Sequence, residues 1–89
     1  MASFGAMDLR QLSHLIAVVE HRSFSAAARA LHTVQSNVST HVARLEKELG
    51  AVLVDRHTMQ PTSEGKAVLE RARRIRTELQ AISDDIVSM

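Results

Sequence analysis

The chain contains no cysteine, tryptophan or tyrosine, and only two phenylalanines, three glycines and one proline in 89 residues. Without cysteine it can form neither disulfides nor thiolate metal sites, which suits a reducing cytoplasm. So few aromatic side chains argue against binding of RNA or single strands, which depends on stacking of bases. The scarcity of turn residues, together with 45% hydrophobic content, predicts an ordered and mainly helical chain.

Motifs for catalysis, cofactors and membrane insertion are also missing from the sequence. No stretch has the length and hydrophobicity of a transmembrane span, and no signal-peptide pattern opens the chain. There is no phosphate-cradling glycine loop and no serine-elbow motif. The five histidines fall on separate predicted elements without metal-ligand spacing; they are His14, His21, His32, His41 and His57. We therefore expect no enzyme activity, no cofactor and no metal site.

The net charge of +1 is low for a nucleic-acid-binding protein, but the charges are unevenly distributed. Between Arg22 and Lys47, Glu46 is the only acid, so this stretch is locally basic. Two copies of a basic face would strengthen the attraction to phosphates.

The segment from Phe24 to Leu49 predicts two helices joined by a tight turn. Ser25 is the expected N-cap of the first helix, whose alanines permit close packing. In the second helix the apolar residues are spaced by four, three and four, which forms one buried stripe: Val38, Val42, Leu45 and Leu49. Its other side carries short polar side chains that can contact base edges and phosphates in a major groove. The pattern is typical of a helix-turn-helix, although an amphipathic hairpin with a solvated face has the same periodicity.

The flanking segments predict the rest of a small DNA-binding fold. Asp8 can cap a first helix that ends near His21, and Phe24 is expected to pack in the core rather than contact a base. Gly50 should end the second helix of the pair. Residues 53–62 then predict a short hairpin with no lysine or arginine at its tip, 57–60. Arg56 can contact a phosphate or form an ion pair with Asp55 or Glu48.

A long helix is predicted from Thr62, with Thr62 or Ser63 as its cap, to the end of the chain. Its apolar residues repeat with heptad spacing, which favours pairing with a second helix; they are Val68, Ala72, Ile75, Leu79, Ile82, Ile86 and Met89. Four arginines within residues 71–76 predict either a solvated face or phosphate contacts. Their match to Asp84 and Asp85 favours antiparallel pairing of two copies.

An ordered set of residues runs through these elements: Leu9, Leu12, Ser23-Phe24-Ser25, Ala27-Ala28, Leu31-His32, Gln35, Val38-Ser39, Leu45-Glu46, Leu49-Gly50, Leu53, Arg56, Thr62 and Gly65. From about Met7 into the helix after Gly65, the chain resembles the N-terminal DNA-binding domain of LysR-type transcriptional regulators. The resemblance implies a winged helix-turn-helix with a three-helix core and a short β-hairpin wing, followed by a long dimerisation helix. The expected divisions are an N-terminal extension at 1–6, the DNA-binding domain at 7–65 with the helix-turn-helix at about 24–43, and the dimerisation helix at 66–89.

The chain departs from the family pattern at three places. Val34 stands where serine is usual, so we expect Thr33 to provide the cap and the helix to begin one residue early. Thr40 replaces a frequent arginine, which weakens or redirects base contacts there. The wing is about two residues shorter than in the family.

The resemblance implies a bacterial transcription regulator in the cytoplasm that binds an inverted-repeat site in double-stranded DNA as a homodimer. A small-molecule effector would bind only a further C-terminal domain, so the chain is expected to be a DNA-binding fragment. The predicted DNA-binding residues are Ser25, Thr33, Gln35, Ser36, Asn37, Ser39, Thr40, His41, Arg44, Arg56 and Thr62. The predicted dimer interface consists of Val68, Ala72, Ile75, Leu79, Ile82 and Ile86. The alternative function is a protein-interaction module that acts through its coiled-coil helix.

Overall fold

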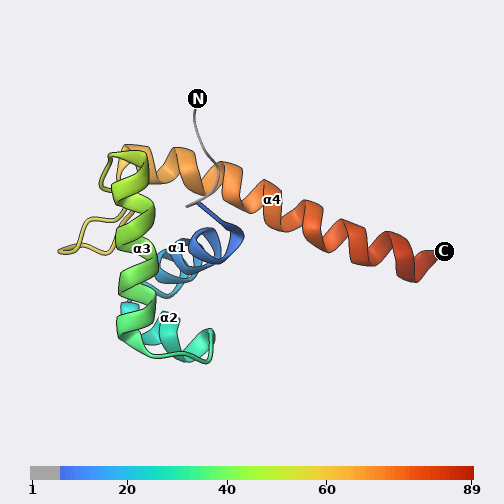
Figure 1. Ribbon diagram of the computed structural model, residues 1–89, viewed down its shortest axis with the longest axis horizontal. Helices are drawn as coiled ribbons and strands as arrows, with labels where there is room; N and C mark the ends of the chain where they lie inside the picture. Colours follow the sequence, from blue (N-terminus) through green and yellow to red (C-terminus); the bar gives the residue numbers. More distant parts are fainter. Residues whose placement is uncertain (1–6) are drawn as a thin grey trace.

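The computed structural model describes residues 7–89, and the expected extension at 1–6 lies outside them. The chain folds into a compact group of three helices followed by a long helix that leaves the group (Figure 1). The mainly helical architecture predicted from the sequence is confirmed. The helices are α1 (Leu9–His21), α2 (Phe24–Ala30), α3 (Gln35–Leu49) and α4 (Ser63–Ser88).

Helix α1 begins with the predicted Asp8 cap. The Oδ1 atom of Asp8 accepts a hydrogen bond from the backbone N–H of Gln11 at 2.9 Å. The side-chain oxygen of Gln11 accepts in return from the backbone N–H of Asp8 at 3.1 Å, which completes a capping box. The helix ends at His21 as expected, and Arg22 follows in the left-handed region with φ 53°.

Helix α2 is capped by Ser23, so the predicted cap at Ser25 is wrong. Ser23 has the extended backbone of an N-cap residue, and its Oγ accepts a hydrogen bond from the N–H of Ala26 at 3.0 Å. Ser25 already lies inside the first turn, where its hydroxyl is 3.1 Å from that of Ser23. Ala27 and Ala28 are buried, which lets the other helices approach α2 closely.

Helix α3 begins at Gln35, so the prediction of a Thr33 cap and an earlier start is also wrong. Val34 occupies the N-cap position and provides no side-chain hydrogen bond. The Thr33 hydroxyl instead accepts from the side-chain amide of Asn37 at 3.0 Å. Gly50 ends the helix with φ 66°, as predicted, because glycine adopts this left-handed conformation without strain.

The core lies where α1, α2 and α3 meet the first half of α4. Its largest fully buried side chains are Leu15, Val18, Val38, Val42, Leu45, Leu53, Val54 and Leu69. Phe24 packs against this cluster, in agreement with its predicted core role. The predicted stripe on α3 is buried except for Leu49, which is 40% exposed at the C-terminal end of the helix.

The wing, residues 53–62, is a loop closed by a single antiparallel bridge between Val54 and Pro61. Three backbone hydrogen bonds cross it, from the N–H of Asp55 to the carbonyl of Gln60 at 2.9 Å, from the N–H of Thr62 to the carbonyl of Leu53 at 3.0 Å and from the N–H of Met59 to the carbonyl of Asp55 at 2.8 Å. The predicted hairpin is therefore reduced to one bridge within residues 7–89. One cause is visible: the amide of Leu53, which in a longer ladder would donate to the carbonyl of the facing Thr62, donates to a side chain of α3 instead, as does the amide of Val54.

Helix α4 starts with the predicted Thr62 cap, which accepts a hydrogen bond from the N–H of Gly65 at 3.0 Å. Gly65 is buried against the backbone of Leu53. A Cβ atom at position 65 would overlap the carbonyl of Leu53, so a larger residue does not fit here. The helix has 26 residues, which corresponds to a length of about 39 Å. Its first half packs on α1, and its second half extends away from the core (Figure 1). None of the helices in 7–89 combines the length and hydrophobicity needed to cross a bilayer.

Candidate nucleic-acid interface

Helix α3 presents a polar face opposite its buried stripe. Val38, Val42 and Leu45 point into the core. Because of the helical period, the side chains of Ser36 and Thr40, and those one turn beyond Thr40, point outward. Five of the predicted DNA-binding residues are exposed on this helix: Gln35, Ser36, Asn37, Thr40 and Arg44. Ser39 and His41 are half-buried on its flanks. The outward face consists mostly of short side chains, so a groove of DNA could approach the helix backbone closely.

The turn before α3 organises two more of the predicted residues. Thr33 is half-buried, and its bond to Asn37 ties the turn to the first turn of the helix. Ser25 is exposed in the first turn of α2.

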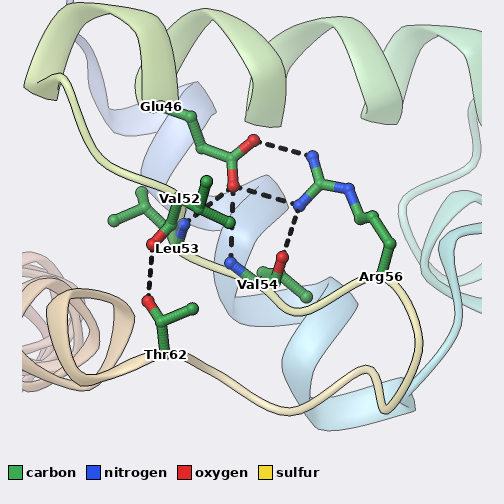
Figure 2. Close-up of polar contacts among 6 residues, drawn as sticks. All are labelled: Glu46, Val52, Leu53, Val54, Arg56 and Thr62. Carbon is green, nitrogen blue, oxygen red and sulfur yellow. Dashed lines mark hydrogen bonds and ion pairs between the residues drawn. The ribbon is translucent and has the colours of Figure 1, made fainter.

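The base of the wing is joined to α3 through Glu46 and Arg56 (Figure 2). Arg56 donates to both carboxylate oxygens of Glu46, with N···O distances of 2.7 and 3.0 Å. The same carboxylate accepts from the amides of Leu53 at 2.8 Å and Val54 at 3.4 Å. Arg56 also donates to the carbonyl of Val54, and its guanidinium lies over the ring of Phe24, 5.2 Å from the centroid. One acid on α3 thereby holds the wing and, through Arg56, the start of α2.

This network changes the interpretation of Arg56. The sequence predicted Asp55 or Glu48 as its internal partner, and both are wrong because neighbours along the chain do not reveal the approach of the wing to α3. Partial burial acts to raise the pKa of Glu46. The hydrogen bonds from Arg56 and Leu53, the charge of Arg56 and the hydrogen bond from the amide of Val54 act to lower it. The second group of effects is larger, so the pKa of Glu46 lies below its ordinary value. The Arg56 side chain as a whole is still 44% exposed.

Thr62 and Asp55 bind the backbone around the wing. The Thr62 hydroxyl donates to the carbonyl of Val52 and accepts from the N–H of Gly65, so it caps the start of α4. The residue is also partly exposed to solvent. Asp55 Oδ1 accepts hydrogen bonds from the amides of His57 and Thr58, and these bonds lower the pKa of the Asp55 carboxyl.

A basic hollow of about 620 Å³ lies between the start of α1 and the C-terminal half of α3. Arg10, Arg44 and Lys47 line it, together with Asp8, Gln11, His41 and Glu48. None of these three cations forms an ion pair within residues 7–89, and this includes the Arg44–Glu48 pair that helix spacing would allow. Sequence reasoning did not select Arg10, because only the packing of α1 on α3 brings it beside Arg44.

The residues of the predicted dimer interface fall into two groups along α4, one buried in the core and one exposed. Ala72 is 2% exposed and Val68 is half-buried, since both pack on the core of their own chain. The burial of Ala72 leaves it little surface for a partner. Four apolar side chains further along remain exposed and form the α4 seam: Ile75 at 39%, Leu79 at 47%, Ile82 at 63% and Ile86 at 67%.

Two of the four α4 arginines are engaged within the chain. Arg74 pairs with Glu70 at 2.9 Å on the same helix, and Arg76 reaches Glu20 on α1 at 3.4 Å. Arg71 and Arg73 form no ion pair in the described part of the chain. Within that part, no group of three or more histidines and acids could hold a metal ion.

Comparison with known proteins agrees with this geometry. The family model described as "Bacterial regulatory helix-turn-helix protein, lysR family" matches residues 9–66. The "SDS degradation transcriptional activation protein" of Pseudomonas sp. (strain ATCC 19151) is 44% identical over 70 residues, which cover 76% of this chain and 23% of that protein. The chain thus spans about a quarter of the length of such relatives.

Solved structures with the same fold include protein–DNA complexes. The BenM_DBD/catB site 1 DNA complex has a TM-score of 0.85 and 31% identity, covering 92% of this chain and 93% of that chain. The CbnR_DBD–DNA complex has a TM-score of 0.77 and 40% identity, covering 92% and 95%.

Proposed function

The chain belongs to the LysR family of bacterial regulatory helix-turn-helix proteins, and from this premise we propose that it binds specific sites in double-stranded DNA and thereby regulates transcription. The observation that carries the proposal is the outward polar face of α3 in a fold shared with two DNA complexes. In the proposed mode α3 enters a major groove with its first turn nearest the base edges. No catalytic activity is proposed, and the cytoplasm is the proposed location.

The side chains divide into two proposed roles. Gln35, Ser36, Ser39 and Thr40 are short enough to read base edges or to let the helix approach them. Arg44 lies about two and a half turns beyond Gln35 and is proposed to contact a backbone phosphate, with Arg56, Thr62, Ser25, Thr33 and Asn37 as flanking candidates. Arg56 would contact DNA only with the part of its side chain that remains exposed beside Glu46.

A homodimer through α4 is the proposed binding unit. The α4 seam would leave four large apolar side chains in water in a monomer, and pairing two seams buries them. Twofold symmetry would then present two α3 helices to an inverted repeat. Any small-molecule effector is proposed to bind a C-terminal domain and not the DNA-binding domain described here.

The test is selection of binding sites from a random duplex library by the purified chain, followed by fluorescence anisotropy. We expect an enriched inverted repeat that binds roughly a hundredfold or more tightly than a scrambled duplex at moderate salt. Equal, weak binding of both duplexes would contradict specific recognition. The alternative of a protein-interaction module has the α4 seam in its favour, but it leaves the polar face of α3 without a role.

A further inference from the structure

Two histidines from different helices face each other inside the domain. His14 of α1 is only 6% exposed, and His41 of α3 is half-buried. Their ring centroids are 4.4 Å apart, and the ring planes are inclined by 44°. The pair therefore lies in the contact between α1 and the helix that carries the proposed base-reading residues.

The hydrogen bond of His14 determines which of its nitrogens carries the proton. Its Nδ1 lies 2.6 Å from the carbonyl oxygen of Arg10, and a carbonyl can only accept. Nδ1 must therefore donate, and Nε2 of the neutral ring carries the lone pair. This Nε2 is buried and has no hydrogen-bond partner in the described part of the chain, and the same is true of Nδ1 of His41. Buried polar atoms are normally paired in native proteins, so these two nitrogens are an exception at a helix contact.

The surrounding charges as a whole oppose a proton on His41. Asp8 and Arg10 face it from α1, and Arg44 does so from α3; Lys47 and Glu48 line the hollow beside His41. Burial, then the neighbouring His14, Arg10 and Arg44, lower the pKa of His41. Asp8 acts in the opposite direction, but its Oδ1 already accepts the amide of Gln11.

We propose that His14 is a positioning residue for α3, and that through its contact with His41 it makes DNA binding weaken as the pH falls through the histidine range. The inference rests on the proposed function and deepens it, because it assigns control of α3 to a residue outside the helix-turn-helix. With both rings neutral, the two helices pack closely. A proton on His41 creates a partly buried cation beside Arg10 and Arg44, which displaces α3 from α1.

The direction of the pH effect distinguishes this role from a phosphate contact. The pKa of His41 is lower in the folded than in the unfolded chain, so its contribution to stability is present above the ordinary histidine pKa and is lost as the pH falls. If His41 instead contacted a phosphate, the DNA would favour its protonated form, and binding would tighten at lower pH.

The experiment measures the affinity of the selected duplex at constant ionic strength for the wild-type chain and for His14→Phe, which keeps a ring but removes both nitrogens. The matched control is His21→Phe, an exposed histidine on the same helix. Between about pH 7.5 and about pH 5.5 we expect wild type and His21→Phe to lose roughly five- to tenfold in affinity, and His14→Phe less than about twofold. Binding that tightens or stays constant at low pH in the wild type, or an unchanged pH dependence in His14→Phe, would overturn the proposal.

A second measurement needs no DNA, and its first comparison needs only the wild-type chain. NMR titration of the His41 ring in the free wild-type chain should give a midpoint below that of the same ring in the urea-unfolded chain. In a folded His14→Phe variant this midpoint should rise. Equal midpoints for His41 in the folded and unfolded wild type would contradict the role of His14 but not the proposed function. Absence of binding to any duplex at any pH would contradict the proposed function itself.

Discussion

Val34 stands at the N-cap of α3, where a side-chain oxygen would normally accept a hydrogen bond from an amide of the first turn. Valine has no such oxygen, and at 64% exposure it contributes little to the core. The nearby Thr33 hydroxyl bonds to Asn37 and does not replace the cap. The turn that presents Gln35 is consequently held without a capping side chain.

Val34→Ser should therefore stabilise the domain. A serine hydroxyl at this extended position can accept from the first-turn amides, which is worth roughly 0.5–2 kcal/mol relative to alanine. Urea unfolding of Val34→Ser and Val34→Ala measures the difference, with alanine controlling for loss of the valine methyls. Equal midpoints in the two variants would show that position 34 gains nothing from a hydroxyl.

Gln35 is the residue for which we expect direct base recognition, because its amide can pair with an adenine edge from the first turn of α3. Gln35→Ala should weaken binding to the selected duplex by roughly 1–3 kcal/mol and binding to a scrambled duplex much less. Anisotropy with both duplexes measures this, and Gln80→Ala on the exposed part of α4 is the control. The same loss on both duplexes would assign Gln35 to positioning only.

At the scale of elements, Glu46 joins α3 to the wing and replaces the missing strand pairing. The carboxylate receives two amides and a bidentate guanidinium, while a single bridge closes the hairpin. The short wing thus depends on a side chain of α3 for its placement, and no lysine or arginine stands at its tip to hold it on DNA.

Glu46→Gln should lower the free energy of unfolding by roughly 1–2 kcal/mol near neutral pH, because it removes charge-assisted bonds at a partly exposed pair. Glu48→Gln, on the same helix and without an ion pair among residues 7–89, should stay within about 0.5 kcal/mol of wild type. Since the pKa of Glu46 is lowered in the folded chain, its contribution is present above the ordinary glutamate range and is lost as the pH falls. Chemical unfolding at neutral and acidic pH tests this. A difference in the free energy of unfolding between wild type and Glu46→Gln that persists at acidic pH would contradict a charged interaction.

At the scale of the whole molecule, α4 has two different surroundings along its length. Leu69 and Ala72 belong to the core, whereas the α4 seam lies outside it with exposure that increases toward the C-terminus. An apolar groove of about 330 Å³ between Leu12, Leu49 and the first half of α4 continues into the seam at Ile75. This continuous apolar surface is the proposed dimer interface.

Leu79→Asp should convert the dimer to a monomer, because it places a charge in the middle of the seam. Sedimentation should show the change in mass, and affinity for a duplex with two half-sites should fall to near that for one half-site. Thr77→Asp is the control, since it adds the same charge on the opposite side of α4. A Leu79→Asp variant that sediments as a dimer would reject the α4 seam as the interface.

Local chemistry along the sequence determined much of this protein. The Asp8 and Thr62 caps, the glycine that ends α3, the buried stripe on α3 and the heptad pattern on α4 each depend on residues within a few positions of one another. The ordered set of residues shared with the LysR family extended these local patterns to a prediction of the whole fold. The match of the family model to residues 9–66 confirms that prediction.

Only the tertiary structure decided which distant side chains meet. The Glu46–Arg56 network, the His14–His41 pair and the approach of Arg10 to Arg44 join segments whose proximity no periodicity predicts. Even the choice between Ser23 and Ser25 as a cap depends on where the chain turns from α1 into α2, and the division of α4 into buried and exposed halves depends on where the core ends. Short-range propensity acts within a turn or two of helix, whereas burial and charge pairing act through space, and the folded chain alone determines those distances.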